Sequence, residues 1–275
     1  MQQTSIVTGG TGGLGSAVVG RLLADGWRVV VPSQPLCCGL TWISTGQLAT
    51  ARRVLQRSVD ALAPYLRRGA KVVGLEPSCT AVFRSDAREL MPGNQDVQRL
   101  RQQTVTLAEL LRDHTDGWQP PHLDGKAIAQ THCHQHAIMG YDADQELLRA
   151  AGVDLDVLDA GCCGLAGNFG FEAGHYEVSR ACGERVLLPA VRDAAASTMV
   201  LADGFSCRTQ IEQGDTGRTP VHLAEVLAAG LRGEPVRPSR PAAPGAADYV
   251  RLGAGAAGVA GVAFGAVAWR RRNHG

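Results

Sequence analysis

The sequence lacks a net charge of either sign. Lys and Arg together number 27 and Asp and Glu 26, which leaves a formal net charge of +1 over 275 residues. A chain so balanced offers no electrostatic footprint for nucleic acid or another polyanion, so we expect neither as a partner. Hydrophobic residues make up 45% of the chain, which is enough to bury one large core or two modest ones.

A secretory signal is also missing after Met1, although the chain has eight cysteines. This combination predicts a reducing, cytoplasmic compartment. Clustered thiols in such a compartment are more often metal or redox ligands than disulfides.

Short β-branched runs alternate along the chain with longer stretches that carry apolar residues at helical spacing. The runs predict strands at 4–7, 27–31, 70–75, 126–131, 155–158 and 198–201, and the stretches predict helices at 48–66, 97–111, 143–151 and 176–191. Such alternation is typical of parallel βαβ units, so we expect an α/β fold.

The same cysteine pattern occurs twice. Cys-Cys-Gly stands at 37–39 and again at 162–164, an offset of 162 − 37 = 125 residues, and Cys79 recurs as Cys207, an offset of 207 − 79 = 128. We interpret the chain as an internal duplication of two pseudo-symmetric, Rossmann-like βαβ halves with parallel sheets.

Each cysteine group follows a predicted strand and precedes a predicted helix. The carboxyl ends of parallel strands face the same way, so residues far apart in sequence converge there on one crevice. The second half adds another strand-end cysteine, which makes a four-thiolate set of Cys133, Cys162, Cys163 and Cys207. Four thiolates suit an iron–sulfur cluster or zinc.

The first half offers only three cysteines, Cys37, Cys38 and Cys79, because the position 125 residues before Cys133 is Thr8. We therefore expect its site to be incomplete. The alternative for all these cysteines is simple apolar packing, but a repeated doublet with a repeated downstream cysteine is hard to attribute to packing. The glycine after each doublet lets backbone approach sulfur.

Five segments together resemble a known family: Pro-Leu-Cys-Cys-Gly at 35–39, Gly-Leu-Glu-Pro-Ser-Cys at 74–79, His-Cys-His-Gln at 132–135, Gly-Cys-Cys-Gly at 161–164 and Ala-Asp-Gly-Phe-Ser-Cys at 202–207. They look like the cysteine-rich "CCG" domain of the B subunit of heterodisulfide reductase and of the iron–sulfur subunits of glycolate and lactate oxidases. They are similar above all to the carboxyl-terminal part of FAD-binding and iron–sulfur-binding oxidoreductases of the D-lactate or D-2-hydroxyglutarate dehydrogenase kind.

The resemblance implies an electron relay through an iron–sulfur cluster, of the 4Fe-4S type. A flavin, with its FAD on a partner or another domain, oxidises a 2-hydroxy acid such as lactate, glycolate or 2-hydroxyglutarate, and the cluster passes electrons to an acceptor. Whole members of the family carry ferredoxin-like cysteine runs, whereas this chain has no Cys-x-x-Cys. We therefore expect an oxidoreductase component that is not catalytic alone, and we predict no catalytic residue.

A glycine-rich loop near the amino terminus resembles the start of a short-chain dehydrogenase/reductase. Gly9, Gly13 and Gly15 lie between a predicted strand and a helix, where such a loop cradles pyrophosphate. That family also needs Tyr-x-x-x-Lys, and no tyrosine of this chain has a lysine four residues on. NAD(P) is thus not expected, and a tight turn is the competing interpretation.

Three alternating histidines, His132, His134 and His136, surround Cys133. They are either proton carriers or outer donors beside a cluster, or ordinary polar residues at a strand end.

The expected organisation has five parts: a dehydrogenase-like β-α-β start at 1–33, the rest of the first half at 34–125, the second half at 126–230, a flexible linker at 231–251 and an apolar tail at 252–275. Residues 252–269 are apolar and three arginines follow, which is near the minimum for a membrane span. Association with the inner face of the membrane and a surface-associated or disordered tail both remain open.

Two other functions compete with electron transfer. One is a zinc-stabilised structural or interaction domain, and the other is an NAD(P)-binding dehydrogenase remnant in an inactive fusion. A truncated reading frame without activity is a third possibility.

Overall fold

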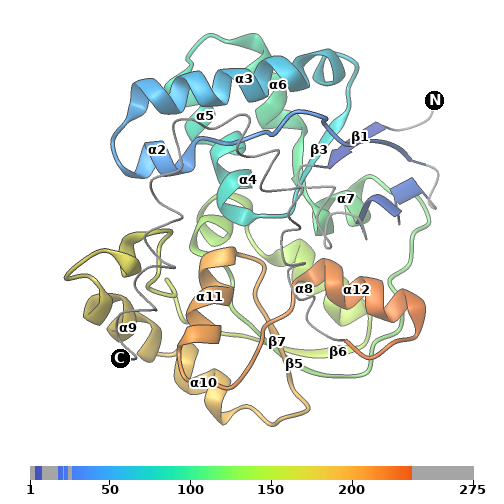
Figure 1. Ribbon diagram of the computed structural model, residues 1–275. Helices are drawn as coiled ribbons and strands as arrows, with labels where there is room; N and C mark the ends of the chain where they lie inside the picture. The colour runs from blue at the N-terminus through green and yellow to red at the C-terminus, as the bar shows by residue number, and fades with distance from the viewer. Residues whose placement is uncertain (1–3, 8–17, 21, 24–26, 237–275) are drawn as a thin grey trace, which may run out of the picture. The chain divides into compact units, whose positions relative to one another are not determined.

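The computed structural model describes residues 4–7, 18–20, 22–23 and 27–236, and it contains two parallel sheets covered by helices (Figure 1). The first sheet has the order β2-β1-β3-β4, with β1 at Thr4–Val7, β2 at Arg28–Val30, β3 at Lys71–Gly74 and β4 at Thr104–Thr106. The second sheet has the order β6-β5-β7, with β5 at Gly125–Ala129, β6 at Val153–Val157 and β7 at Met199–Leu201. The predicted α/β fold is confirmed.

The two sheets share one topology. In each, the first strand is flanked by the second and third, and all pairs are parallel. Ile6 lies opposite Val30 and Val72 in the first sheet. Ile128 lies opposite Asp156 and Val200 in the second. This matched order confirms two pseudo-symmetric, Rossmann-like halves.

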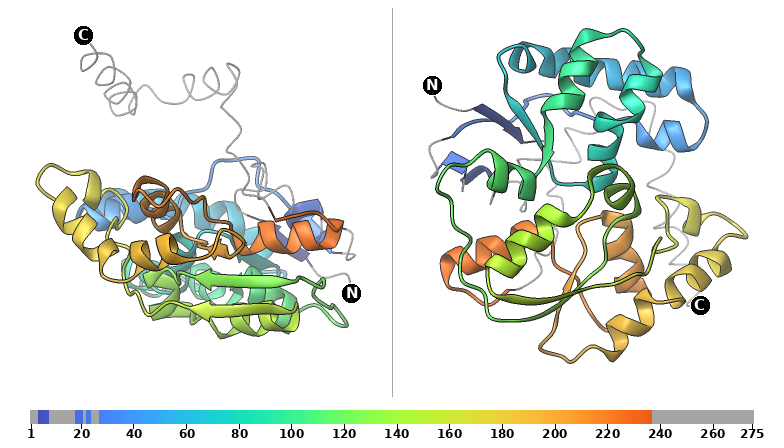
Figure 2. Two further views of the ribbon diagram at one scale, coloured as in Figure 1. Left: turned by 90° about the horizontal axis from the view of Figure 1, so that it is seen from below. Right: turned by 180° about the vertical axis from the view of Figure 1, so that it is seen from behind.

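The described helices fall into two groups, which Figure 2 shows from two further sides. Those of the first half are α2 Leu40–Ser44, α3 Leu48–Leu66, α4 Pro77–Arg84, α5 Asp86–Leu90, α6 Gln95–Gln103 and α7 Leu107–Asp113. Those of the second half are the π-helix η1 Gln135–Met139, α8 Asp142–Ala150, the 3-10 helix η2 Phe169–Phe171, α9 Tyr176–Glu184, α10 Leu187–Asp193, α11 Phe205–Gln213 and α12 Leu223–Arg232.

The prediction of one continuous helix over 97–111 is wrong, because a strand interrupts it. The structure has α6, then strand β4, then α7. The Thr104-Val105-Thr106 run is β-branched and pairs with β3. Thr106 then starts α7 through a capping box, since its side chain accepts from the Glu109 N–H and the Glu109 carboxylate accepts from the Thr106 N–H.

The predicted helix at 176–191 is broken into α9 and α10. Pro189 has no N–H and its ring would clash with the carbonyl of Arg185, four residues earlier, if one helix ran through. The chain breaks at Val186, whose φ of −145° is not helical.

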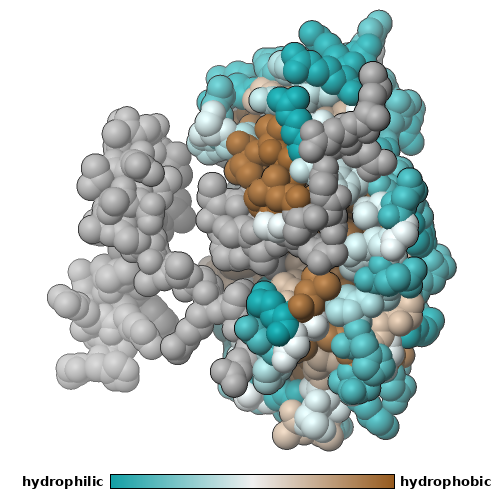
Figure 3. Space-filling model, turned by 90° about the vertical axis from the view of Figure 1, so that its right-hand side faces the viewer, coloured by the Kyte–Doolittle hydropathy of each residue, from teal (hydrophilic) through white to brown (hydrophobic). Residues whose placement is uncertain are grey.

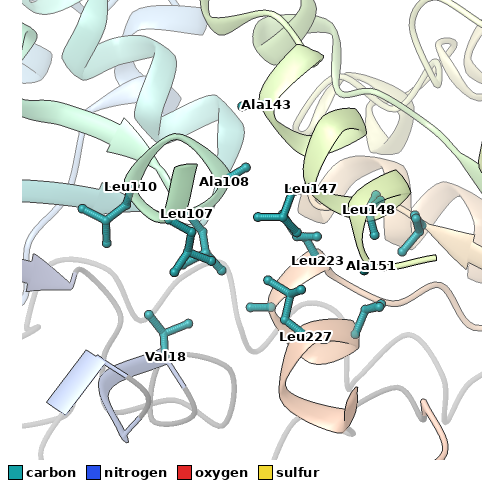
Figure 4. Packing of buried hydrophobic residues seen from close by; sticks show 14 of the residues in the cluster. Val18, Leu107, Ala108, Leu110, Ala143, Leu147, Leu148, Ala151, Leu223 and Leu227 are labelled. Carbon is teal, nitrogen blue, oxygen red and sulfur yellow. The ribbon is translucent and has the colours of Figure 1, made fainter. Parts of the chain in front are cut away.

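One hydrophobic core joins the two halves. Leu107 and Leu110 of α7 pack in the same cluster as Leu147 of α8 and as Leu223 and Leu227 of α12 (Figure 4). The cysteine-bearing edges of both halves are therefore held in one packed body.

On the side of the molecule shown in Figure 3, brown apolar areas interrupt a mainly teal and white surface. A groove between α7 and α12 is lined by apolar side chains that include Leu111, Trp118 and Leu231. Among the described helices none is both long and apolar enough to cross a membrane. The apolar tail at 252–275 and the glycine-rich loop with Gly9, Gly13 and Gly15 lie outside the described residues.

Candidate metal centre

The two cysteine doublets occupy equivalent places. Cys37 and Cys38 follow β2, and Cys162 and Cys163 follow β6. In each doublet the first cysteine is exposed and the second is buried, at 4% and 3% exposure. In each, the N–H of the following glycine donates to the sulfur of the first cysteine at 3.4 Å. These N–H groups favour a thiolate at that sulfur.

The downstream cysteines also match. Cys79 is the third residue of α4, directly after β3, and Cys207 is the third residue of α11, directly after β7. Both sulfurs therefore lie in the first turn of a helix, where the helix dipole stabilises negative charge.

Cys133 follows β5, the central strand of the second sheet. The equivalent strand of the first sheet is β1, and the residue after it is Thr8. Thr8, which the offset of 125 residues matches to Cys133, and the residues up to 17 that follow it lie outside the described residues.

In the first half, the Cys38 thiol donates to the Cys79 sulfur at 3.1 Å. Although the contact with Cys37 acts in the opposite direction, the Cys79 contact and burial raise the pKa of Cys38 to about 12. The backbone of Cys37 is held by Ser58 of α3, whose hydroxyl accepts from the Cys37 N–H at 3.0 Å and donates to its carbonyl at 2.8 Å.

In the second half, the four sulfurs form a row of contacts. The neighbouring thiols of Cys133 and Cys163 lower the pKa of Cys162 to about 2. The contact with Cys162, one with Cys207 and burial raise the pKa of Cys163. The contact with Cys162 and burial likewise raise the pKa of Cys133. One thiolate, on the exposed Cys162, is thus stabilised by two neighbouring thiols.

Two histidines lie beside Cys133. Within the described part of the chain, donor atoms of His132, Cys133 and His134 all fall within 4.8 Å of one another. Burial lowers the pKa of His132, and the His134 Nδ1 is buried without a hydrogen-bond partner among the described residues. His136 is exposed. The neutral imidazole of His132 and the unpartnered nitrogen of His134 are both compatible with metal ligation.

Two polar side chains, one buried and one partly exposed, hold the loop around the second doublet in place. The Gln130 amide at the end of β5 donates to the Gly161 carbonyl, before the doublet, at 2.9 Å. The Ser206 hydroxyl of α11 accepts from the Gly167 N–H, after the doublet, at 3.1 Å. The cysteine loop is thereby tied to the end of β5 and to the first turn of α11.

A carboxylate joins the two halves at these edges. Glu76 caps α4 by accepting from the N–H and hydroxyl of Ser78 at 3.3 and 2.7 Å, and its other oxygen accepts from the N–H of Phe205 at 2.9 Å. The ring of His222 contacts the Leu75 carbonyl at 2.8 Å.

A second carboxylate is buried nearby. Asp144 of α8 is 3% exposed and accepts from the Gln135 amide at 3.3 Å. Burial, with Asp203 as a second cause, raises the pKa of Asp144 well above its usual range. Asp144 and Asp203 line one small cavity, beside the π-helix that follows Cys133. Such π-helical turns often occur at functional sites.

Sequence reasoning pointed to seven cysteines at strand ends, and the structure places each of them there. It missed Glu76 and Asp144, whose roles depend on contacts between separate elements. Glu76 belongs to the segment 74–79, one of the five that carry the resemblance, but nothing in the sequence indicates its hydrogen bond with Phe205. The eighth cysteine, Cys182, lies in α9 and was assigned no role.

The matching sheets of the two halves, and the matching positions of the cysteines after their strands, define a duplicated α/β domain. Compared with known proteins, the chain is 31% identical over 224 residues to the C subunit of anaerobic glycerol-3-phosphate dehydrogenase from Escherichia coli K12, a match that covers 79% of this chain and 55% of that protein. It is 25% identical over 228 residues to lactate utilization protein A of Bacillus velezensis, covering 78% of this chain and 92% of the relative.

A third relative is D-2-hydroxyglutarate dehydrogenase of Pseudomonas putida, 26% identical over 184 residues, which are 66% of this chain and 17% of that enzyme. The chain thus spans about half the length of the first relative and a smaller part of this one. No family model matches the chain.

Proposed function

We propose that this chain is an iron–sulfur electron-transfer module of the cysteine-rich "CCG" kind, serving a flavin-linked dehydrogenase. The observation that carries the proposal is the row of sulfur contacts formed by Cys133, Cys162, Cys163 and Cys207 at the carboxyl edge of the second sheet. Four thiolates from three strand ends are the ligand set that a [4Fe–4S] cluster needs.

The residues fit such a group by their chemistry. Cluster ligands bind as thiolates, and the second doublet already stabilises negative charge through two thiols and the Gly164 N–H. Cys163 and Cys207 are buried, so they shield the site from water, while Cys162 is exposed toward solvent. When bound, the cluster supplies a centre that takes up and releases single electrons.

We propose a lesser role for the first half. Cys37, Cys38 and Cys79 supply three thiols, and the residue 125 positions before Cys133 is Thr8, which is not a thiol. Metal at this set requires a ligand from elsewhere, so we expect weaker binding there. On this proposal, residues 34–125 and 126–230 form the two cysteine-bearing halves.

The names of the relatives support the choice of partner and substrate class. They are a subunit of a glycerol-3-phosphate dehydrogenase, a lactate utilization protein and a 2-hydroxyglutarate dehydrogenase. We propose that the module accepts electrons from an FAD-carrying partner that oxidises a 2-hydroxy acid and passes them to a further acceptor in the cytoplasm. Glycerol 3-phosphate is the competing substrate of such a partner.

The test is anaerobic purification followed by analysis of iron, acid-labile sulfide and zinc, with absorption spectra before and after dithionite. We expect stoichiometric iron and sulfide and a visible absorption that bleaches on reduction. The Cys163→Ser variant should lose both the bound iron and sulfide and the visible absorption. Cys182→Ser is the matched control, because Cys182 has no place in the ligand row, and it should retain them. Zinc alone, or no metal under strict anaerobiosis, would overturn the proposal.

A second candidate function is a zinc-stabilised interaction domain. It is favoured by one observation, the grouping of His132, Cys133 and His134 within 4.8 Å, because mixed histidine and cysteine ligands suit zinc. The same metal analysis separates the two candidates: His134→Ala should remove zinc from a zinc site but leave the iron of a four-cysteine cluster.

A further inference from the structure

A cleft of about 580 Å³ lies beside the edge strand β4, away from the cysteine doublets. It is bounded by the ends of α4, α6 and α7, by the start of β3 and by the π-helix η1. Its lining includes Lys71, Arg84, Arg101, Thr104 and His114.

The acidic side chains of this cleft are already paired. Glu109 accepts two hydrogen bonds from Arg84, at 2.8 and 2.7 Å. Asp113 is paired with Arg112 at 2.6 Å. Neither carboxylate is therefore left to neutralise the remaining cations of the cleft.

Two cations stay uncompensated. Lys71 and Arg101 have no carboxylate partner within the described residues. The Arg101 Nε donates to the Arg84 carbonyl at 3.1 Å, which holds the guanidinium in place and leaves its two terminal nitrogens for another acceptor. The cleft thus presents two positive charges without anionic partners among the residues that the structure describes.

His114 adds a neutral donor. Burial, together with the charge of Lys71, lowers the pKa of His114, against the opposing influence of Asp113 and Glu109. The imidazole is therefore uncharged at neutral pH and a bound negative charge would reverse the shift.

We propose that this cleft binds a small multivalent oxyanion, through carboxylate or phosphate oxygens held by Lys71 and Arg101. Guanidinium and ammonium groups form charge-assisted hydrogen bonds with both kinds of oxyanion. Two uncompensated cations favour a dianion over a monovalent one. The site is independent of the cysteine centre and of the function proposed for it.

The test uses the full chain, purified anaerobically with its metal, at low ionic strength. Calorimetric titrations with inorganic phosphate and with 2-hydroxyglutarate distinguish the phosphate source from the dicarboxylate source. The variant Lys71→Gln/Arg101→Gln should weaken binding of the preferred anion by at least about tenfold, because it removes both charge-assisted hydrogen-bond donors. The control variant Lys126→Gln/Arg52→Gln removes the same amount of charge from exposed positions. It should change the dissociation constant of the preferred anion by less than about twofold.

The wild-type protein supplies a second readout. In an NMR titration the preferred anion should raise the pKa of His114, and it should not do so in the cleft variant. Failure of both anions to bind at millimolar concentration, or an equal loss in the control variant, would overturn the proposal.

Discussion

The carboxylate of Glu76 accepts a hydrogen bond from the backbone N–H of Phe205, at 2.9 Å, across 129 residues of sequence. Its other oxygen accepts from Ser78. One side chain therefore caps both α4, which carries Cys79, and α11, which carries Cys207. The capping contacts of two pseudo-equivalent helices meet on one residue.

Removal of the Glu76 side chain should weaken both helix starts. We expect Glu76→Ala to lower the free energy of unfolding by about 1–3 kcal/mol, because three donors, the N–H and hydroxyl of Ser78 and the N–H of Phe205, lose their acceptor. Urea unfolding of the anaerobically purified protein measures this.

Glu76→Gln keeps an acceptor oxygen but removes the charge. If the second half holds the proposed cluster, its reduction potential should rise, because loss of a negative charge at the start of the helix that carries Cys207 favours the reduced form, which holds one more electron. Potentiometric titration checks this, with the exposed Glu89→Gln as control. An unchanged potential in an intact Glu76→Gln protein would limit Glu76 to helix capping.

Gly164 should tolerate no side chain. Its φ is +96°, and a Cβ there would overlap the Ser179 carbonyl oxygen and lie 2.9 Å from Cys182 Cβ. We expect Gly164→Ala to cost at least about 3 kcal/mol, because helix α9 must move. Bound metal should fall with it.

Gly161 provides the comparison. It has φ +63°, but a Cβ added at this position would meet nothing within 4 Å among the described residues. Gly161→Ala should therefore cost only the left-handed strain of about 1–2 kcal/mol. Equal denaturation midpoints for the two alanine variants would show that the contact with α9 is unimportant.

Asp144 should make stability depend on pH. Because its pKa in the folded protein is raised above the ordinary value of 3.8, folding favours the protonated form. That contribution is complete below the ordinary pKa and is lost as pH rises through the folded pKa, by up to about 1.4 kcal/mol per pH unit.

The side chain at this position cannot ionise in the Asp144→Asn variant, so the variant should not lose stability in this way as the pH rises. Its unfolding free energy relative to wild type should therefore increase from pH 4.5 to pH 8 in urea titrations. The exposed Asp142→Asn, from the first turn of the same helix, is the control and should show no such trend. A wild-type protein whose stability is parallel to that of Asp144→Asn across this range would contradict the raised pKa.

Cys207 and Cys79 occupy equivalent helix positions but differ in their partners. We expect Cys207→Ser to lower bound iron more than Cys79→Ser, because Cys207 belongs to a set of four cysteines and Cys79 to a set of three. Iron and sulfide analysis of the two variants, purified side by side, measures the difference. The opposite order would mean that the first half holds the principal site.

Much of the fold could be predicted because it depends on local pattern. Residues 4–7 and 48–66 form a strand and a helix with the predicted limits. The prediction failed at β4, because a three-residue edge strand between two amphipathic helices leaves the helical periodicity of 97–111 almost undisturbed. The prediction of one helix over 176–191 failed at Val186. Pro189, three residues later, has no N–H and its ring would clash with the Arg185 carbonyl in a continuous helix.

The positions of the cysteines after the strands followed from the sequence alone, because each group stands shortly after a β-branched run and the carboxyl ends of parallel strands lie on one side. The repeat of the doublet likewise determined two matched halves. Only the tertiary structure decided which side chains meet those edges. The bond from Glu76 to Phe205, the burial of Asp144 and the unpaired charges of Lys71 and Arg101 all depend on how separate helices and strands pack. No local pattern encodes a contact between residues that lie far apart in sequence.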